Sequence, residues 1–154
     1  MKKLLTKLRT HYPHITFVEG EHFYWSPGSA TVTYCFDSEN DKQRITLLHE
    51  LAHALLEHTT FTTDFELLRI EVTAWRKAQE LGKRYAVNIP EEHIEKCLDT
   101  YRDWLHSRST CPDCLNNGIQ AKSDRLYRCP NCRQTWKVST SRLCRPYRQV
   151  ATTK

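Results

Sequence analysis

The stretch that decides the fold is residues 45–56, which read ITLLHELAHALL. It places His49 and His53 four positions apart, and side chains at that spacing lie one above the other on an α-helix. Two imidazole nitrogens on one face can bind a zinc ion, which accepts such ligands at about 2.0–2.1 Å and prefers a tetrahedral shell. We therefore expect a helix over about 42–58 that carries part of a metal site.

Glu50 follows the first histidine and projects about 100° around the helix from it. Its carboxylate would then lie beside a metal, where it can take a proton from a polarised water and pass it to a leaving group. This is the HExxH pattern of zinc metalloproteases. A chance match on an ordinary helix is the alternative, but the apolar flanks argue against it, because unpartnered polar groups are costly to bury.

Zinc needs a third protein ligand, and a second predicted helix over about 64–85 offers Glu71. Glu71 falls in the middle of the apolar stripe of that helix, which comprises Leu67, Leu68, Ala74, Trp75, Ala78, Leu81 and Tyr85. An inward carboxylate needs a cation or a hydrogen-bond partner. The metal would supply the cation, and pairing with an Arg or His is the alternative. His58 is a poorer ligand, because on a continuous helix it points about 140° away from His53.

The elements around these helices predict an α+β fold. A short basic helix is expected over 2–10, strands over 14–18, 23–25 and 30–36, and a third long helix from about Glu91 to His106. Ser26-Pro27-Gly28-Ser29 suits a type II turn between the second and third strands.

Four cysteines follow the spacing C-x2-C-x14-C-x2-C, with proline after the first cysteine of each pair. These residues are Cys111, Cys114, Cys129 and Cys132. Two such knuckles can close a four-thiolate zinc site, which has no open position and is therefore structural. The spacer contains the hairpin-turn signal Asn116-Asn117-Gly118, and 126–128 and 134–138 are expected to be strands. Disulfides or a redox pair are the alternatives. Cys97 is expected to be a buried small hydrophobe, and no role is assigned to Cys144.

Charge divides the chain at the same place as the cysteines. Residues 1–107 carry 13 Lys/Arg and 16 Asp/Glu, whereas residues 108–154 carry 10 Lys/Arg and 2 Asp/Glu. We therefore predict a catalytic domain over 1–107 and a four-cysteine zinc ribbon with a basic tail over 108–154. The ribbon's basic residues interleave with Tyr127, Trp136 and Tyr147, which suits nucleic acid. A solvated basic surface or a protein-docking module is nearly equally favoured.

The composition is that of an ordinary soluble protein, with 39% hydrophobic and 27% charged residues. No apolar run reaches the roughly 20 residues that span a membrane, and the N-terminal segment lacks the apolar core of a signal peptide. We therefore expect a cytoplasmic protein, and a reducing compartment argues against disulfides.

The stretch from His49 to Leu56, followed by Glu71-Val72-Thr73-Ala74, resembles the small ImmA/IrrE-type metallopeptidases over about residues 14–86. The resemblance implies a minimal zincin-like domain, with a short β-sheet before the HExxH helix. It also implies zinc ligation by His49, His53 and Glu71, with Glu50 as general base. Trp75 stands where that family more often has a polar residue. From zincin architecture in general, the 32–36 strand could pair with an extended substrate. Tyr85, His58 and His93 are candidates for stabilising the oxyanion.

A HExxH domain followed by a zinc ribbon also resembles the SprT-like proteases, which act on proteins at DNA. That family's third ligand is normally a histidine, and none of His58, His93 and His106 stands in the expected context. The sequence thus predicts a peptidase with two zinc ions, one catalytic and one structural, acting on a regulatory or DNA-associated protein. The alternative is a non-hydrolytic zinc protein whose ribbon binds nucleic acid or a protein partner.

Overall fold

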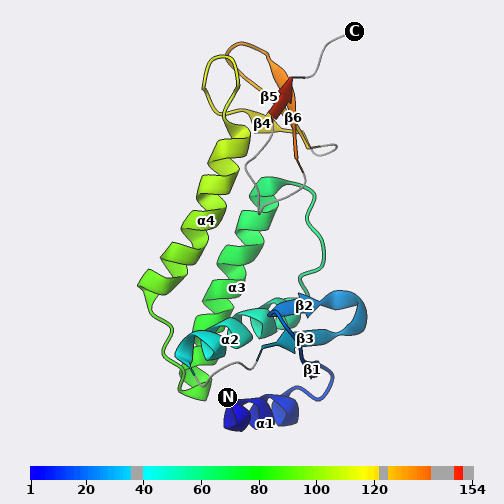
Figure 1. Cartoon of the computed structure of the whole chain (residues 1–154), viewed down its shortest axis with the longest axis vertical. Coiled ribbons are helices and arrows are strands. Elements are labelled where there is room, and N and C mark those ends of the chain that lie inside the picture. The colour runs from blue at the N-terminus through cyan, green and yellow to red at the C-terminus, as the bar shows by residue number, and fades with distance from the viewer. Residues whose placement is uncertain (36–39, 122–124, 140–147, 151–154) are drawn as a thin grey trace. The chain divides into compact units, whose positions relative to one another are not determined.

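The computed structural model describes residues 1–35, 40–121, 125–139 and 148–150. Over these residues the fold is α+β, as predicted, with four α-helices, a three-stranded sheet and a four-stranded sheet (Figure 1). No helix in the described ranges combines the length and the apolar character needed to cross a membrane.

The chain forms two compact units. The first comprises Met1–Thr60 and Ile70–Ile94, and the second comprises Phe61–Arg69 and Glu95–Lys154. Helices α3 (Asp64–Tyr85) and α4 (Glu91–Ser109) each contribute residues to both units. The two units do not meet at a single position in the sequence, so the domain boundary after residue 107 stays a prediction.

The first unit is a small sheet with helices beside it. Strands β1 (Thr16–Glu19), β2 (Tyr24–Ser26) and β3 (Thr31–Tyr34) lie in the order β1-β3-β2, with β1 parallel and β2 antiparallel to β3. Helix α1 (Lys2–His11) contacts β1, and α2 (Asp41–Leu55) lies against β2 and β3 (Figure 1). The core of this unit includes the fully buried Leu8, Val32, Leu47, Leu48, Leu51, Ala52, Ala74 and Ala78.

Two predictions about the sheet are wrong. Pro27–Ser29 forms a short 3-10 helix, η1, and the left-handed residue is Ala30, with φ of 47°, instead of Gly28. Strand β3 is the central strand, so its backbone is paired on both sides and cannot add a substrate strand. After β1 the chain first forms β2, and it then returns to form β3 between the two earlier strands.

Helix α2 is shorter than predicted at its C-terminal end. It begins after Asn40, whose side chain accepts a hydrogen bond from the Gln43 backbone N–H at 2.9 Å. It ends at Leu55, and Glu57 adopts a left-handed φ of 52°. The backbone N–H of His58 then donates to the carbonyl of His53 at 3.0 Å, as in a Schellman motif. The chain thus turns back, and His58 returns to the end of the helix that it was expected to extend.

The second unit contains a four-cysteine ribbon that follows α4. Its strands are β4 (Ile119–Gln120), β5 (Leu126–Arg128), β6 (Thr135–Val138) and β7 (Arg148–Val150), all antiparallel in that order. Tyr127 and Trp136 face each other across β5 and β6, with ring centroids 5.6 Å apart and planes at 12°. Gly118 is required beside them, because a Cβ there would lie 2.3 Å from the Trp136 ring.

A buried ion pair ties the start of α3 to the end of α4 within this unit. The guanidinium of Arg108 donates to Asp64 at 2.5 and 3.3 Å, and the Tyr127 hydroxyl donates to the same carboxylate at 2.7 Å. Arg108 also donates to the Ser139 carbonyl, and its own carbonyl accepts from the Trp136 indole at 2.9 Å. Arg108 and Asp64 are 1% and 4% exposed, so this pair belongs to the core and not to the predicted basic surface.

We expect Arg108→Ala to destabilise the second unit by about 3–5 kcal/mol, because it leaves the Asp64 carboxylate buried without its cation. The measurement is the urea midpoint of the zinc-loaded chain. Arg102→Ala is the matched control on the same helix, since Arg102 is exposed and pairs with Glu95 and Asp99 at the surface. Equal midpoints for the two variants would show that the buried pair does not hold the unit together.

Candidate metal centres

Three side chains of the first unit converge on one point. Helix α2 supplies His49 and His53, whose Nε2 atoms lie 3.1 Å apart, and α3 supplies Glu71. The Glu71 carboxylate oxygens lie 3.2 Å from the His49 Nε2 atom and 3.7 Å from the His53 Nε2 atom. All three residues are buried, with 7%, 9% and 7% of their surface exposed.

This donor set fits a zinc ion. A tetrahedral zinc shell with ligands at about 2.0–2.1 Å separates the ligand atoms by about 3.3 Å, close to the distances found here. One Glu71 oxygen, Oε2, is buried and makes no hydrogen bond with good geometry among the described residues. Burial raises the pKa of Glu71, but hydrogen bonding and charge from His49 and His53 outweigh it and hold the pKa far below the usual range. The carboxylate is therefore ionised and suited to a cation.

Glu50 lies beside this group without belonging to it. Burial raises the pKa of Glu50 above its ordinary value and outweighs the influence of the neighbouring His49 and His53, which lowers it. A hydrogen bond from the backbone of Trp25 in β2 also lowers the pKa of Glu50. A raised pKa suits a carboxylate that both takes up and releases a proton.

The two histidines are held in place by different contacts. The His49 ring stacks on Trp75, with centroids 4.0 Å apart and planes at 24°, and His93 meets the edge of Trp75 at 5.6 Å. The Nδ1 atom of His49 makes no hydrogen bond among the described residues. The Nδ1 atom of His53, by contrast, lies 2.9 Å from the Nδ1 atom of His58. Among the described residues Trp75 therefore holds the His49 ring by stacking, whereas His53 is held by a contact between ring nitrogens.

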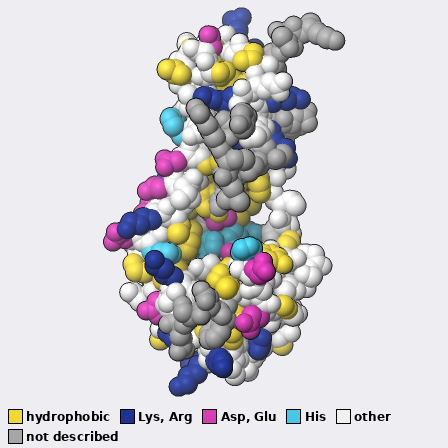
Figure 2. All heavy atoms as spheres, in the orientation of Figure 1, with side chains coloured by type: hydrophobic (Ala, Val, Ile, Leu, Met, Phe, Trp, Pro, Cys, Tyr) yellow, Lys and Arg dark blue, Asp and Glu magenta, His cyan; other side chains and the backbone are white. Residues whose placement is uncertain are grey.

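Figure 2 shows histidine side chains gathered beside acidic ones on the face in view. Of the candidate oxyanion residues, His58 and His93 belong to the surroundings of the histidine pair. Tyr85 is too far away, because it follows Glu71 by 14 residues on α3, about 21 Å along the axis. It hydrogen bonds with His11 at 2.7 Å instead.

The four ribbon cysteines form a second group of donor atoms. The Sγ atoms of Cys111 and Cys132 are 3.5 Å apart, and those of Cys114 and Cys129 are 3.4 Å apart. Tetrahedral zinc with thiolates at about 2.3 Å would separate them by about 3.8 Å, and all four lie within 4.8 Å of one another. The sulfurs are not bonded, so the disulfide alternative does not describe this arrangement.

The two knuckles repeat the same backbone turn. The N–H of Cys111 donates to the Asn116 carbonyl at 2.8 Å, and the N–H of Cys129 donates to the Gln134 carbonyl at 2.8 Å. The residue after each second cysteine is left-handed, with φ of 62° at Leu115 and 64° at Arg133. The predicted turn in the spacer differs, because Asn117 pairs with Thr110 in a β-bridge instead of forming a hairpin tip.

The pKa values of two of these thiols, Cys114 and Cys132, are shifted in opposite directions. Hydrogen bonds from the Asn116 backbone and from the Asn131 and Asn116 amides lower the pKa of Cys114 to about 5. The Gln134 backbone lowers the pKa of Cys132, but burial and the neighbouring thiols outweigh it and raise the pKa to about 12. Four thiols this close compete for negative charge, and a divalent cation removes that competition.

The basic surface predicted for the ribbon loses Arg108, which is buried. Five of its cations are exposed in the described residues, namely Arg125, Arg128, Arg133, Lys137 and Arg148. Tyr127 and Trp136 are 1% and 0% exposed, so they cannot serve as stacking platforms for bases. Tyr147 and Cys144 lie outside the described residues, and Cys97 is only half-buried.

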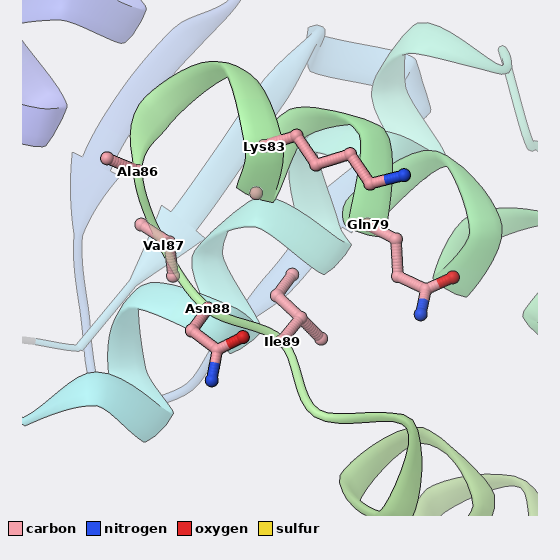
Figure 3. A pocket seen from close by; sticks show the side chains of 7 residues that line it. Gln79, Lys83, Ala86, Val87, Asn88 and Ile89 are labelled. Carbon is pink, nitrogen blue, oxygen red and sulfur yellow. The ribbon is translucent and has the colours of Figure 1, made fainter.

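A cavity of about 360 Å³ lies away from the histidine pair, at the C-terminal end of α3 (Figure 3). Its lining includes Gln79, Lys83 and residues 86–89, which offer no cluster of metal-binding side chains. Gly82 lets the chain turn back here, since a Cβ would lie 2.7 Å from the Val87 carbonyl oxygen. The cavity therefore lies where α3 ends and the chain turns back along it.

Comparison with protein families gives one finding that covers most of the chain. The model of the IrrE N-terminal-like domain, peptidase family M78, matches residues 17–145. Comparison with curated proteins and with solved structures gives no match. The match confirms the ImmA/IrrE-type resemblance, whereas the SprT-like resemblance stays a prediction. This chain belongs to peptidase family M78, the family of the IrrE N-terminal-like domain.

Proposed function

We propose that the chain is a zinc-dependent metallopeptidase in which His49, His53 and Glu71 bind zinc and Glu50 is the general base. One observation carries the proposal: three buried donor atoms from two helices converge at zinc-like distances, next to a carboxylate with a raised pKa. The family supports a protein or peptide substrate. We further propose a regulatory or DNA-associated protein as that substrate.

The chemistry follows from where the side chains lie. Zinc in this site would polarise a water and the scissile carbonyl. Glu50 would take the proton from the attacking water and hand it to the departing amine, a role for which a carboxylate with a raised pKa is suited. His49, His53 and Glu71 would keep three positions of the shell filled by protein and leave the remaining side for the reacting groups.

We propose strand β2 as the edge that aligns the substrate. Among the described residues β2 pairs only with β3, so its other side is a free edge. The backbone of Trp25 in this strand donates a hydrogen bond to Glu50, which places the edge next to the general base. An extended peptide added along β2 would then pass the reacting centre.

We propose that the ribbon holds a second, structural zinc and serves for targeting. Four thiolates fill a tetrahedral shell, so this centre has no position for a substrate. The exposed cations Arg125, Arg128, Arg133, Lys137 and Arg148 favour a polyanionic partner, a nucleic acid backbone or an acidic protein, bound through charge. A non-hydrolytic protein that binds its partner through this surface is the alternative to the peptidase.

Glu50→Gln is expected to keep its metal and to lose about 10²–10⁴-fold in cleavage rate, because the amide cannot accept the proton. The measurement counts new amino termini in a degenerate peptide library by mass spectrometry, with zinc content determined on the same samples. Glu80→Gln is the matched control, an exposed glutamate on α3. Equal cleavage by the wild type and Glu50→Gln would refute the role of Glu50 and favour the non-hydrolytic alternative.

We expect two zinc ions per chain. His49→Ala should retain one, held by the ribbon, and Cys129→Ser should retain the other, because the two donor groups share no residue. Native mass spectrometry reads the stoichiometry directly. A wild-type chain with a single zinc, or a His49→Ala chain that still holds two, would contradict the assignment of the ligands.

We expect double-stranded DNA to bind through the ribbon and its affinity to fall steeply as the salt concentration rises. Five phosphate contacts would give a slope of log affinity against log salt of about −4.5, and Arg128→Glu should reduce its magnitude by at least about 1. Arg102→Glu on α4 is the control outside the ribbon. The absence of binding at low ionic strength would assign the basic surface to an acidic protein instead.

A further inference from the structure

The end of α2 brings a third histidine, His58, against His53, one of the two histidines among the three proposed ligands. Because Glu57 is left-handed, the chain reverses and the His58 N–H donates to the His53 carbonyl. The same reversal sets the Nδ1 atoms of His53 and His58 2.9 Å apart. Two neutral imidazoles can meet in this way only when one nitrogen carries a proton and the other accepts it.

Thr73 decides which of the two nitrogens carries the proton. Its hydroxyl donates to the Ile70 carbonyl at 2.9 Å, and its oxygen lies 3.4 Å from the His58 Nε2 atom. Because the hydroxyl donates to the Ile70 carbonyl, the Thr73 oxygen can accept from His58 Nε2–H. A neutral His58 protonated on Nε2 has a lone pair on Nδ1, so His53 Nδ1–H is the donor to it.

We propose that His58 and Thr73 are positioning residues, which hold His53 as the Nδ1–H tautomer and turn its Nε2 lone pair toward His49 and Glu71. The inference rests on the proposed function, because it concerns a ligand of the same metal. Histidines that bind metals usually donate their other ring N–H to a partner, which fixes the tautomer and the ring orientation. Here the partner is a second imidazole, held in turn by a hydroxyl.

Several contacts keep His58 in this role. The Trp25 indole N–H donates to the His58 carbonyl at 2.9 Å, which ties the reversed segment to β2. The rings of His53 and His58 meet at 67° with centroids 5.0 Å apart, so the contact is made through the nitrogens instead of by stacking.

His49 provides an internal contrast. It stacks flat on Trp75, and its Nδ1 atom has no hydrogen-bond partner among the described residues. Loss of His58 should therefore change the tautomer of His53 and leave that of His49 as it was. A general loosening of the unit would disturb both rings together.

The test measures the tautomer in the metal-free state and the zinc affinity separately, with Zn²⁺ alone as the metal. Imidazole ¹⁵N shifts of the full chain should show His53 as the Nδ1–H tautomer, and His58→Leu should shift it toward the Nε2–H form. The same variant should bind zinc at the histidine site about 10–100-fold more weakly in competition with a chelator. His58→Asn, whose side-chain oxygen can accept the proton, should restore most of both properties.

Two controls separate a specific role from a structural one. Thr73→Val should produce the same changes in smaller size, and Thr73→Ser should remain close to the wild type, so the proposal stays testable even if His58→Leu does not fold. His22→Leu replaces an exposed histidine and should change neither readout.

The inference is overturned if His58→Leu and Thr73→Val leave the His53 tautomer and the zinc affinity unchanged, or if His58→Asn fails as badly as His58→Leu. Failure of the proposed function looks different: His49→Ala would then bind as much zinc as the wild type. The tautomer is measured without metal, so that outcome would leave the hydrogen-bond result readable by itself.

Discussion

A buried carboxylate facing two imidazoles is the constraint on which the first unit depends. Glu71 sits on the apolar side of α3, between residues that pack into the core, and burial of a lone carboxylate would be costly. Its neighbours are the Nε2 atoms of His49 and His53, which present lone pairs if they are to bind a metal. Such a group is stable as a set only when a cation, or protons on the histidines, balances the negative charge.

The helices and strands around this group can be understood as its support. The four-residue spacing on α2 sets the two nitrogens side by side, and the sheet provides the wall against which α2 packs. The two ligands are then oriented by different means, an aromatic face for His49 and a hydrogen bond for His53.

The second unit solves a different problem with different chemistry. Its core is too small to be held by apolar packing alone, and it combines two repeated cysteine knuckles with a buried Arg108–Asp64 pair and the stacked rings of Tyr127 and Trp136. The polar groups in this core are joined to one another, so the burial of the ion pair is compensated by hydrogen bonds. The second unit therefore has one buried cation, Arg108, which stabilises its core, and further cations that are exposed at its surface.

Residue spacing predicted the fold class and the residues that meet at both centres, and the resemblance of 49–56 and 71–74 to a known family predicted the family. Spacing on a helix indicated His49 and His53, the inward stripe indicated Glu71, and the cysteine pattern indicated the second group. The sequence could not indicate the place of His58, because it depends on a single turn of the backbone. No glycine marks the end of α2 at Glu57, so the helix was expected to continue and His58 to point away.

Sequence patterns also could not show which individual polar and aromatic residues are buried. Tyr127 and Trp136 look like stacking platforms for nucleic acid when read along the chain, because alternation in a short ribbon strand does not show which face is covered. Arg108 and Tyr127 both bond to Asp64, 44 residues before Arg108, and the Trp136 indole donates to the Arg108 carbonyl. Contacts this distant in sequence bury the three residues. The central place of β3 likewise results from pairing with β1, which local sequence does not encode.

Anomalous diffraction from crystals of the zinc-loaded chain, recorded on both sides of the zinc absorption edge, tests the central claim most directly. We expect one peak within about 2.0–2.1 Å of the Nε2 atoms of His49 and His53 and of a Glu71 oxygen, and another at the centre of the four cysteine sulfurs. The His58 ring should lie outside that distance. A map with no peak between the histidines and Glu71, or with His58 in place of Glu71 as a ligand, would contradict it.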